Sequence, residues 1–244
     1  MSGLEMESGS GTTGRMRAAK AIETPGRSLD PAWLISWSGL ALALGGILIA
    51  LYLFLHPGDT EPGSVAVINS SPYTLVKSPI VAGLIILQLG LIGYYARLMG
   101  GSRYLALVAF LLTFLSAGLA VGGLFTDAFI NPILAANQPA LLNRGGVVLA
   151  DVPLTLASAI PHLTLALGFV LLGIATLRQR RLPRLAGGAL VIAGLLLVIP
   201  PFGSTAWRLY DLAGLLLVLS LGWIGLAIWR RTGTAPPEGP VATG

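Results

Sequence analysis

One histidine, three aspartates and an arginine lie toward the ends of the apolar segments that make up most of this chain. They are His162, Asp127, Asp151, Asp211 and Arg208. A histidine within hydrogen-bond reach of a carboxylate can act as a general acid or base. One interpretation is therefore an outward-facing polar pocket that binds a ligand, with His162 at its floor and the aspartates at its rim.

His162 is the deepest of these groups. It lies about nine residues into the apolar segment 154–177, or roughly 13 Å below the end of a helix that rises 1.5 Å per residue. Pro161 precedes it. A proline removes a backbone donor and can kink a helix, which would open space beside the imidazole.

A purely structural interpretation of the same residues stays open. Arg208 and Asp211 are spaced i, i+3, which allows an ion pair on one helix. The aspartates would then form salt bridges at the membrane interface, and His162 would bond to a neighbouring helix. We assign none of these residues as catalytic.

The elements that must position these groups are six long apolar segments. Of the 244 residues, 55% are hydrophobic and only 10% are charged, whereas soluble domains have about 25% charged residues. A spanning helix needs roughly 20 apolar residues. The segments that meet this length, the fifth being the shortest, are 32–55, 79–98, 104–125, 154–177, 185–202 and 206–229.

The basic residues indicate how these segments are oriented. Twelve of the fifteen lie in the N-terminal tail, in the connections 99–103 and 178–184 with their flanks, and after the last segment. The other face has only Lys77, Arg144 and Arg208. Positive residues are retained in the cytoplasm. We therefore predict an all-α, six-helix transmembrane bundle with both termini cytoplasmic and a long outer loop between the third and fourth helices.

The chain divides into three parts by composition. Residues 1–30 and 232–244 are rich in small and polar residues, and we expect two disordered cytoplasmic tails around a transmembrane domain at 31–231. The outer connection 126–153 has apolar residues at partly helical spacing, which predicts one or two short helices against the interface. The run 64–68 in the first outer connection has a β-like pattern.

Several kinds of site are excluded or disfavoured. The chain has no cysteine, so thiolate metal sites, iron–sulfur clusters and cysteine nucleophiles are absent. The two histidines, His56 at the mouth and His162 well inside, do not share a depth, so we expect no bis-histidine haem. No metal ligands or other cofactor are expected. The net charge of +5 reflects topology rather than nucleic-acid binding, because no basic stripe carries interleaved aromatics.

Polar residues near the middle of the segments are few: Gln88, Ser116, Thr164 and Ser220. None is ionisable, which disfavours a proton-coupled transporter. We expect Gln88 to make an interhelical hydrogen bond. The pair of glycines at 118 and 122 permits close backbone approach, which we assign to packing within the bundle rather than to a dimer.

Two stretches carry a resemblance. These are LGIATLR at 172–178, followed by RLPRLAG at 181–187, and DAFINPILA at 127–135. They resemble the cytoplasmic turn and the outer loop of uncharacterised multi-pass proteins, a domain-of-unknown-function group of actinobacteria and Chloroflexi. The resemblance covers most of residues 32–230. It implies a bacterial inner membrane and no particular reaction.

Three functions remain to be compared. The favoured one is a non-enzymatic subunit that binds lipid, a membrane-protein partner or a second copy of itself. A permease for a small solute would predict a central cavity. An enzyme acting at the outer leaflet would bring His162 within hydrogen-bond reach of Asp127, Asp151 or Asp211.

Overall fold

The computed structural model describes residues 31–55, 65–70, 72–142, 152–199 and 204–232, and within these ranges it contains helices and no strand. The long helices are α1 (Pro31–Leu55), α3 (Tyr73–Leu98), α4 (Arg103–Phe125), α7 (Val152–Arg178), α8 (Arg184–Val198) and α9 (Ser204–Thr232). The short ones are α2 (Val65–Ile68), the π-helical turn η1 (Thr126–Ile130), α5 (Asn131–Asn137) and the 3₁₀ turn η2 (Pro139–Leu141). The predicted tail 1–30 lies outside the described residues, as do 233–244.

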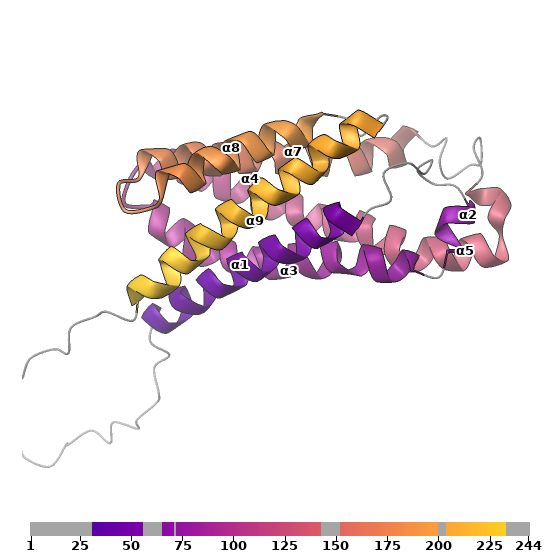
Figure 1. Cartoon of the computed structure of the whole chain (residues 1–244), viewed down its shortest axis with the longest axis horizontal. Coiled ribbons are helices and arrows are strands. Elements are labelled where there is room, and N and C mark those ends of the chain that lie inside the picture. Colours follow the sequence, from indigo (N-terminus) through magenta and orange to yellow (C-terminus); the bar gives the residue numbers. More distant parts are fainter. Residues whose placement is uncertain (1–30, 56–64, 71, 143–151, 200–203, 233–244) are drawn as a thin grey trace, which may run out of the picture. The chain divides into compact units, whose positions relative to one another are not determined.

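Each long helix packs mainly against two others, so the order of neighbours is closed (Figure 1). α1 lies between α3 and α9, α4 lies between α3 and α7, and α8 lies between α7 and α9. Long helices that follow one another in sequence are therefore spatial neighbours throughout, which is the usual arrangement in proteins. The contact between α1 and α9, the first and last long helices, closes this ring of neighbours.

Five of these helices are long and apolar enough to cross a membrane, whereas α8 is apolar but shorter. Their outward faces carry large apolar side chains: Leu89, Leu115 and Leu119 are 59%, 61% and 64% exposed. Water-soluble proteins rarely expose contiguous apolar surface of this kind. The predicted all-α class is confirmed, and the architecture is that of a multi-pass membrane protein.

The space between the helices is filled by one apolar core to which all six long helices contribute. A representative side chain from each, none more than 1% exposed, is Leu42, Leu91, Ala109, Phe169, Leu190 and Leu221. Close packing of this kind supplies the dispersion energy that drives helix association in lipid. The core thus runs through the interior of the bundle.

Glycines allow two of the helix pairs to approach closely. A Cβ atom on Gly39 of α1 would lie 2.5 Å from the carbonyl oxygen of Gly225 on α9. A Cβ on Gly173 of α7 would lie 2.7 Å from the carbonyl oxygen of Gly187 on α8. No real Cβ atom sits so near an oxygen, so only glycine fits at these crossings. By contrast, Gly122 on α4 faces open space, so the expected packing of the 118/122 pair within the bundle is wrong at Gly122.

The second long helix begins six residues earlier than Pro79, where the sequence placed its start. α3 starts at Tyr73 and includes Pro79 in its interior. Proline has no N–H for the carbonyl four residues back, which here belongs to Leu75. The hydroxyl of Ser78 donates a hydrogen bond to that carbonyl oxygen at 3.2 Å. The Leu75 carbonyl thus keeps a hydrogen-bond donor, and the helix continues through the proline.

The outer connections are helical where the structure describes them. The prediction of a β-like run at 64–68 is wrong, because Val65–Ile68 forms the helical turn α2. Its Ile68 is buried in a small cluster with Ala135 of α5 and with Leu142, which follows η2. The apolar side chains of α2 therefore pack against α5 and the residue after η2. The short helices predicted after the third segment are confirmed as η1 and α5, which follow α4 without a break.

Candidate functional site

Asp127 is the centre of a polar cluster at the end of α4. It lies on η1, a π-helical turn, and such turns occur frequently at functional sites. Its carboxylate accepts hydrogen bonds from Lys77 Nζ at 2.7 Å, from the Tyr73 hydroxyl at 2.6 Å and from Asn131 Nδ2 at 3.2 Å. Thr74 adds a bond from its hydroxyl to the Ala128 carbonyl at 3.1 Å. The first turn of α3 is therefore fastened to η1.

Lys77 is the cationic partner in this cluster and is the more buried of the two, with 12% of its side chain exposed against 30% for Asp127. Its ammonium lies 5.4 and 5.5 Å from the ring centroids of Tyr52 and Tyr73, within cation–π range. It also contacts the Tyr52 hydroxyl at 3.4 Å. We call Tyr52, Tyr73, Lys77, Asp127 and Asn131 the outer cluster.

The outer cluster joins helices that are distant in sequence. Tyr52 comes from α1, Tyr73 and Lys77 from α3, Asp127 from η1 and Asn131 from α5. Charge-assisted hydrogen bonds are about twice as strong as neutral ones, and a partly buried pair is screened less by salt than an exposed one. The arrangement compensates each charge locally and holds the outer ends of α1, α3 and α4 together.

His162 on α7 has a different set of partners. Its Nε2 lies 2.9 Å from the carbonyl oxygen of Leu197 and 3.1 Å from the Tyr210 hydroxyl, and the Tyr210 hydroxyl donates to the same carbonyl at 3.4 Å. A carbonyl oxygen only accepts, so Nε2 carries the proton in this geometry. The two rings lie nearly parallel, with centroids 6.2 Å apart.

The bonded carbonyl explains the role of His162. Leu197 is in the last turn of α8, where the carbonyls have no partner within the helix. Side chains from α7 and α9 supply the missing donors. His162 and Tyr210 thus cap the carboxyl end of the short helix α8. The predicted bond between His162 and a neighbouring helix is present, and no proton-transfer partnership with a carboxylate is needed to account for its position.

Tyr52 of the outer cluster and Tyr210 of the capped end of α8 lie on neighbouring helices, α1 and α9, and both belong to the apolar core or pack against it. His162 bonds the Leu197 carbonyl and the Tyr210 hydroxyl, whereas Asp127 bonds Lys77, Tyr73 and Asn131. The structure therefore gives His162 and Asp127 separate sets of partners.

The other sequence-derived candidates fall elsewhere. Arg208 and Asp211 are both exposed on α9, and the ion pair recorded among the described residues is Lys77–Asp127 rather than Arg208–Asp211. Asp151 lies outside the described residues. Within the described ranges, no group of three or more histidine, aspartate or glutamate side chains could hold a metal ion.

Sequence reasoning missed the parts played by Lys77, Tyr52, Tyr73 and Tyr210. Lys77 was counted only as a minority charge on the outer side. One signal was present: Lys77 and Asp127 are single opposite charges at the outer ends of consecutive apolar segments. Consecutive helices usually pack together, so these two charges at the same depth could have been paired.

Polar side chains deeper in the bundle bond between helices or to their own backbone. Gln88 Nε2 donates to the Phe114 carbonyl at 3.0 Å, which confirms the predicted interhelical bond. Gly118 makes room for this amide, since a Cβ there would lie 3.1 Å from Gln88 Nε2. The Ser116 hydroxyl donates to Thr164 Oγ1 at 2.7 Å and joins α4 to α7.

These features define the class: an all-helical bundle with the helix lengths and the apolar surface of a multi-pass membrane protein. Comparison of the chain with protein-family models, with curated proteins and with solved structures found no match. Its function is therefore argued from its own geometry.

Proposed function

We propose that the chain is a six-pass protein of the bacterial inner membrane, with both termini in the cytoplasm, that acts as a non-enzymatic subunit binding lipid or a membrane-protein partner. The bacterial assignment follows the resemblance of 127–135 and 172–187 to uncharacterised multi-pass bacterial proteins. A second copy of the chain is one of the partners that the proposal includes. No nucleic acid is part of the proposal.

The connectivity around α8 supports a sixth crossing. Its 15 residues extend about 22 Å at 1.5 Å per residue, against a hydrocarbon core of about 30 Å. It starts next to the end of α7 and its last turn is bonded to His162. His162 is sixteen residues before Arg178, or about 24 Å along α7. α8 therefore spans most of the depth that α7 spans.

The observation that carries the non-enzymatic role is how the polar groups of the outer side are used. Asp127 is bonded to three side chains and His162 to a helix-end carbonyl. An outer-leaflet enzyme would need His162 directed at a carboxylate or a substrate. The continuous apolar core likewise argues against a permease, which needs a central binding site. Binding of a lipid or a protein partner at the exposed surface of the bundle is the function that these features leave in place.

Extraction of the tagged chain in polymer-bounded native nanodiscs tests the proposal. Proteins and lipids in the discs are measured by mass spectrometry against the bulk membrane, with the Asp127→Asn variant alongside. We expect enrichment of a defined lipid or protein in both samples, because Asp127 has no chemical role. Recovery of a monomer with the bulk lipid composition and no stoichiometric protein would contradict the proposal.

A further inference from the structure

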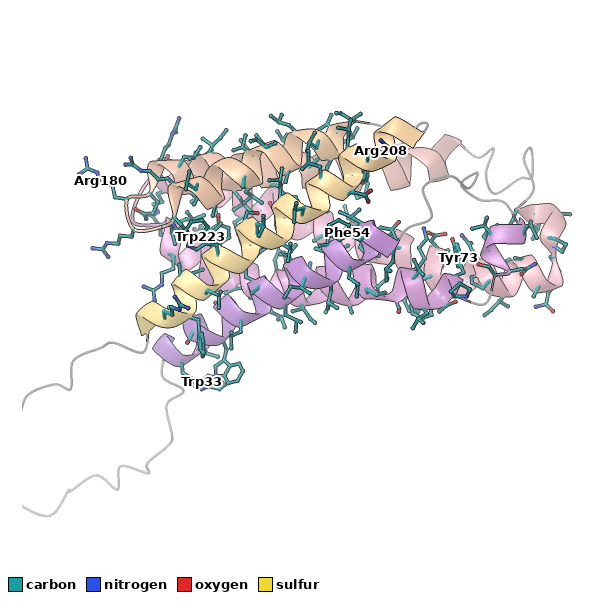
Figure 2. All side chains as sticks on the ribbon, viewed as in Figure 1. Trp33, Phe54, Tyr73, Arg180, Arg208 and Trp223 are labelled. Atoms are coloured by element: carbon teal, nitrogen blue, oxygen red, sulfur yellow. The ribbon has the colours of Figure 1, made fainter. Side chains whose placement is uncertain are left out.

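A second polar region lies at the opposite end of the bundle from the outer cluster. A cavity of about 300 Å³ opens there between the end of α3, the turn from α7 to α8 and the end of α9. Its polar lining comes from Arg97, Gln179 and Arg181. Figure 2 shows Arg180, in the same turn, at the end of the bundle that also carries Trp33, and away from Tyr73 and Arg208. We call this cavity the inner pocket.

One donor of Arg97, a residue that lines the inner pocket, has no partner among the described residues. The Nε atom of Arg97 is buried and makes no hydrogen bond within the described part of the chain. Gln179 does not fill this role, because its Nε2 donates to the Arg97 carbonyl oxygen at 2.9 Å. Buried polar groups are nearly always hydrogen-bonded, so such an exception points to a group that completes it.

The charges around the pocket specify the chemistry of that group. Arginine donors in a forked arrangement match the oxygens of phosphate and carboxylate. Among the described residues the carboxylates are Asp127 and Asp211, and they lie on the outer side, at the end of α4 and the beginning of α9. Among the described residues, therefore, no carboxylate offsets the positive charge of Arg97 and Arg181 in the inner pocket. Helix ends and topology account for arginines near this surface, but not for a buried donor that lacks an acceptor.

The level of the pocket within the bundle specifies where the ligand comes from. Trp229 follows Ile228, which lines the pocket, and the Ser36 hydroxyl bonds the Trp229 carbonyl at 3.5 Å. Trp33, Trp37 and Trp229 are each about half exposed, at 51%, 55% and 45%. Exposed tryptophans mark the headgroup level of a membrane, so the pocket opens at the depth of lipid phosphates.

We infer that the inner pocket binds the phosphate of an anionic phospholipid through the guanidinium groups of Arg97 and Arg181. A cavity of about 300 Å³ is at the small end of ligand sites, which span roughly 300–1,000 Å³. It has room for a phosphodiester headgroup while the acyl chains stay in the bilayer. Basic pockets between helices on the cytoplasmic side recognise such headgroups. The inference deepens the proposed function and rests on its membrane orientation.

The test uses the full chain in nanodiscs of phosphatidylcholine, with or without phosphatidylglycerol, and with inorganic phosphate as the soluble probe. The thermal midpoint and the retention of phosphatidylglycerol in native mass spectrometry are measured for the wild type, Arg97→Gln, Arg181→Gln and Arg103→Gln. Arg103 is an exposed arginine at the same end of the bundle and serves as the matched control. A ligand that binds only the folded state raises the midpoint.

We expect phosphatidylglycerol to raise the midpoint of the wild type and of Arg103→Gln. In Arg97→Gln the apparent affinity for this lipid should fall about tenfold, as for loss of a charge-assisted bond, with a smaller fall in Arg181→Gln. In phosphatidylcholine alone, Arg97→Gln should melt no lower than the wild type, because it removes an unsatisfied donor. This last measurement separates lost binding from lost folding.

Two results would overturn the inference. Equal losses in Arg97→Gln and Arg103→Gln would mean diffuse surface attraction instead of a site. Stabilisation by inorganic phosphate equal to that by the lipid, and lost in Arg97→Gln, would keep the phosphate chemistry but refute the lipid as its source. If native nanodiscs contain a specific protein partner, the proposed function stands even when the pocket inference fails. If the chain is recovered alone but still needs Arg97 to bind phosphatidylglycerol, the pocket inference stands and the partner-binding role fails.

Discussion

The Lys77–Asp127 pair shows how a single bond can organise the outer side of this bundle. Each charge lies at the end of its helix, and each would be costly to leave unpaired where it is. Tyr73 and Asn131 also donate to the Asp127 carboxylate, and the Lys77 ammonium also bonds the Tyr52 hydroxyl. A pair bonded in this way contributes to the fold through its geometry.

Removal of one partner of this pair should destabilise the protein. We expect Lys77→Met or Asp127→Asn each to lower the free energy of unfolding by about 1–3 kcal/mol, because a partly buried group loses its partner. The double variant should cost less than the sum of the two, with a coupling of about 0.5–3 kcal/mol. Unfolding by denaturing detergent, followed by tryptophan fluorescence, measures each step.

The exposed Arg103→Met variant is the control for loss of a charge. It should stay within about 0.5 kcal/mol of the wild type. Additive effects of the two cluster variants would show that Lys77 and Asp127 do not act as a pair.

Individual contacts were only partly predictable from the sequence. Gln88 could be assigned an interhelical bond because an amide in lipid must find a partner, whatever that partner is. The bond from His162 to Leu197 could not be specified in the same way, because it depends on where α8 ends. Its last turn packs between α7 and α9. Tyr52 and Tyr210 carried no signal at all, since tyrosines near span ends are ordinary interface anchors.

At the level of elements, the short helix α8 depends on its neighbours for its last turn. Replacement of His162 by leucine should remove the better of the two donors to the Leu197 carbonyl. We expect a loss of about 1 kcal/mol and faster amide hydrogen exchange over residues 194–199, while exchange in the middle of α7 stays unchanged. His162→Gln, which keeps an N–H donor, should recover part of both effects.

Leu163→Ala provides the comparison, because Leu163 is next in sequence and 48% exposed. It should leave exchange at the end of α8 as it is. Exchange that is the same in His162→Leu and in the wild type would show that the capping bond has no part in holding this turn.

The close crossing of α1 and α9 can be tested with two glycines of one helix. Gly225 of α9 faces the Gly39 carbonyl, whereas Gly222 has no atom within 4 Å of the Cβ it lacks. Gly225→Ala should therefore force the helices apart and cost about 1–3 kcal/mol. Gly222→Ala should be neutral or stabilising by up to about 1 kcal/mol, the difference in helix propensity. Thermal unfolding in detergent compares the two, and shifts of the same sign and size would refute the crossing.

Element boundaries followed from the sequence except where local chemistry overrode a general rule. Most predicted segments agree with the helices to within a few residues, because composition defines the apolar length. The second apolar segment was predicted to start at Pro79. The Ser78 hydroxyl compensates for the missing donor, so the helix extends back to Tyr73 and carries Lys77 toward Asp127. Because the second segment was started at Pro79, Lys77 was left outside the predicted helix and was not paired with Asp127.

For the molecule as a whole, the closed order of neighbours and the two polar ends divide its surface into functional regions. The outer end carries a compensated ion pair and a capped helix. The inner end carries arginines with no carboxylate among the described residues. An apolar belt lies between them. An unequal distribution of basic residues between the two ends is typical of a membrane protein with a fixed orientation, and the proposed six-pass topology requires α8 to cross the bilayer.

Single cysteines can establish that crossing, since the chain has none of its own. Arg180 precedes α8, Arg208 follows it, and both side chains are exposed. In intact cells a membrane-impermeant maleimide should label Arg208→Cys, and also Asn137→Cys at the end of α5. Arg180→Cys should react only after the membrane is permeabilised. If α8 instead turned back within the bilayer, Arg180→Cys and Arg208→Cys would react from the same side, and the six-pass assignment would be wrong. Labelling of all three after permeabilisation verifies that each site is reactive, so a silent position reports its side of the membrane.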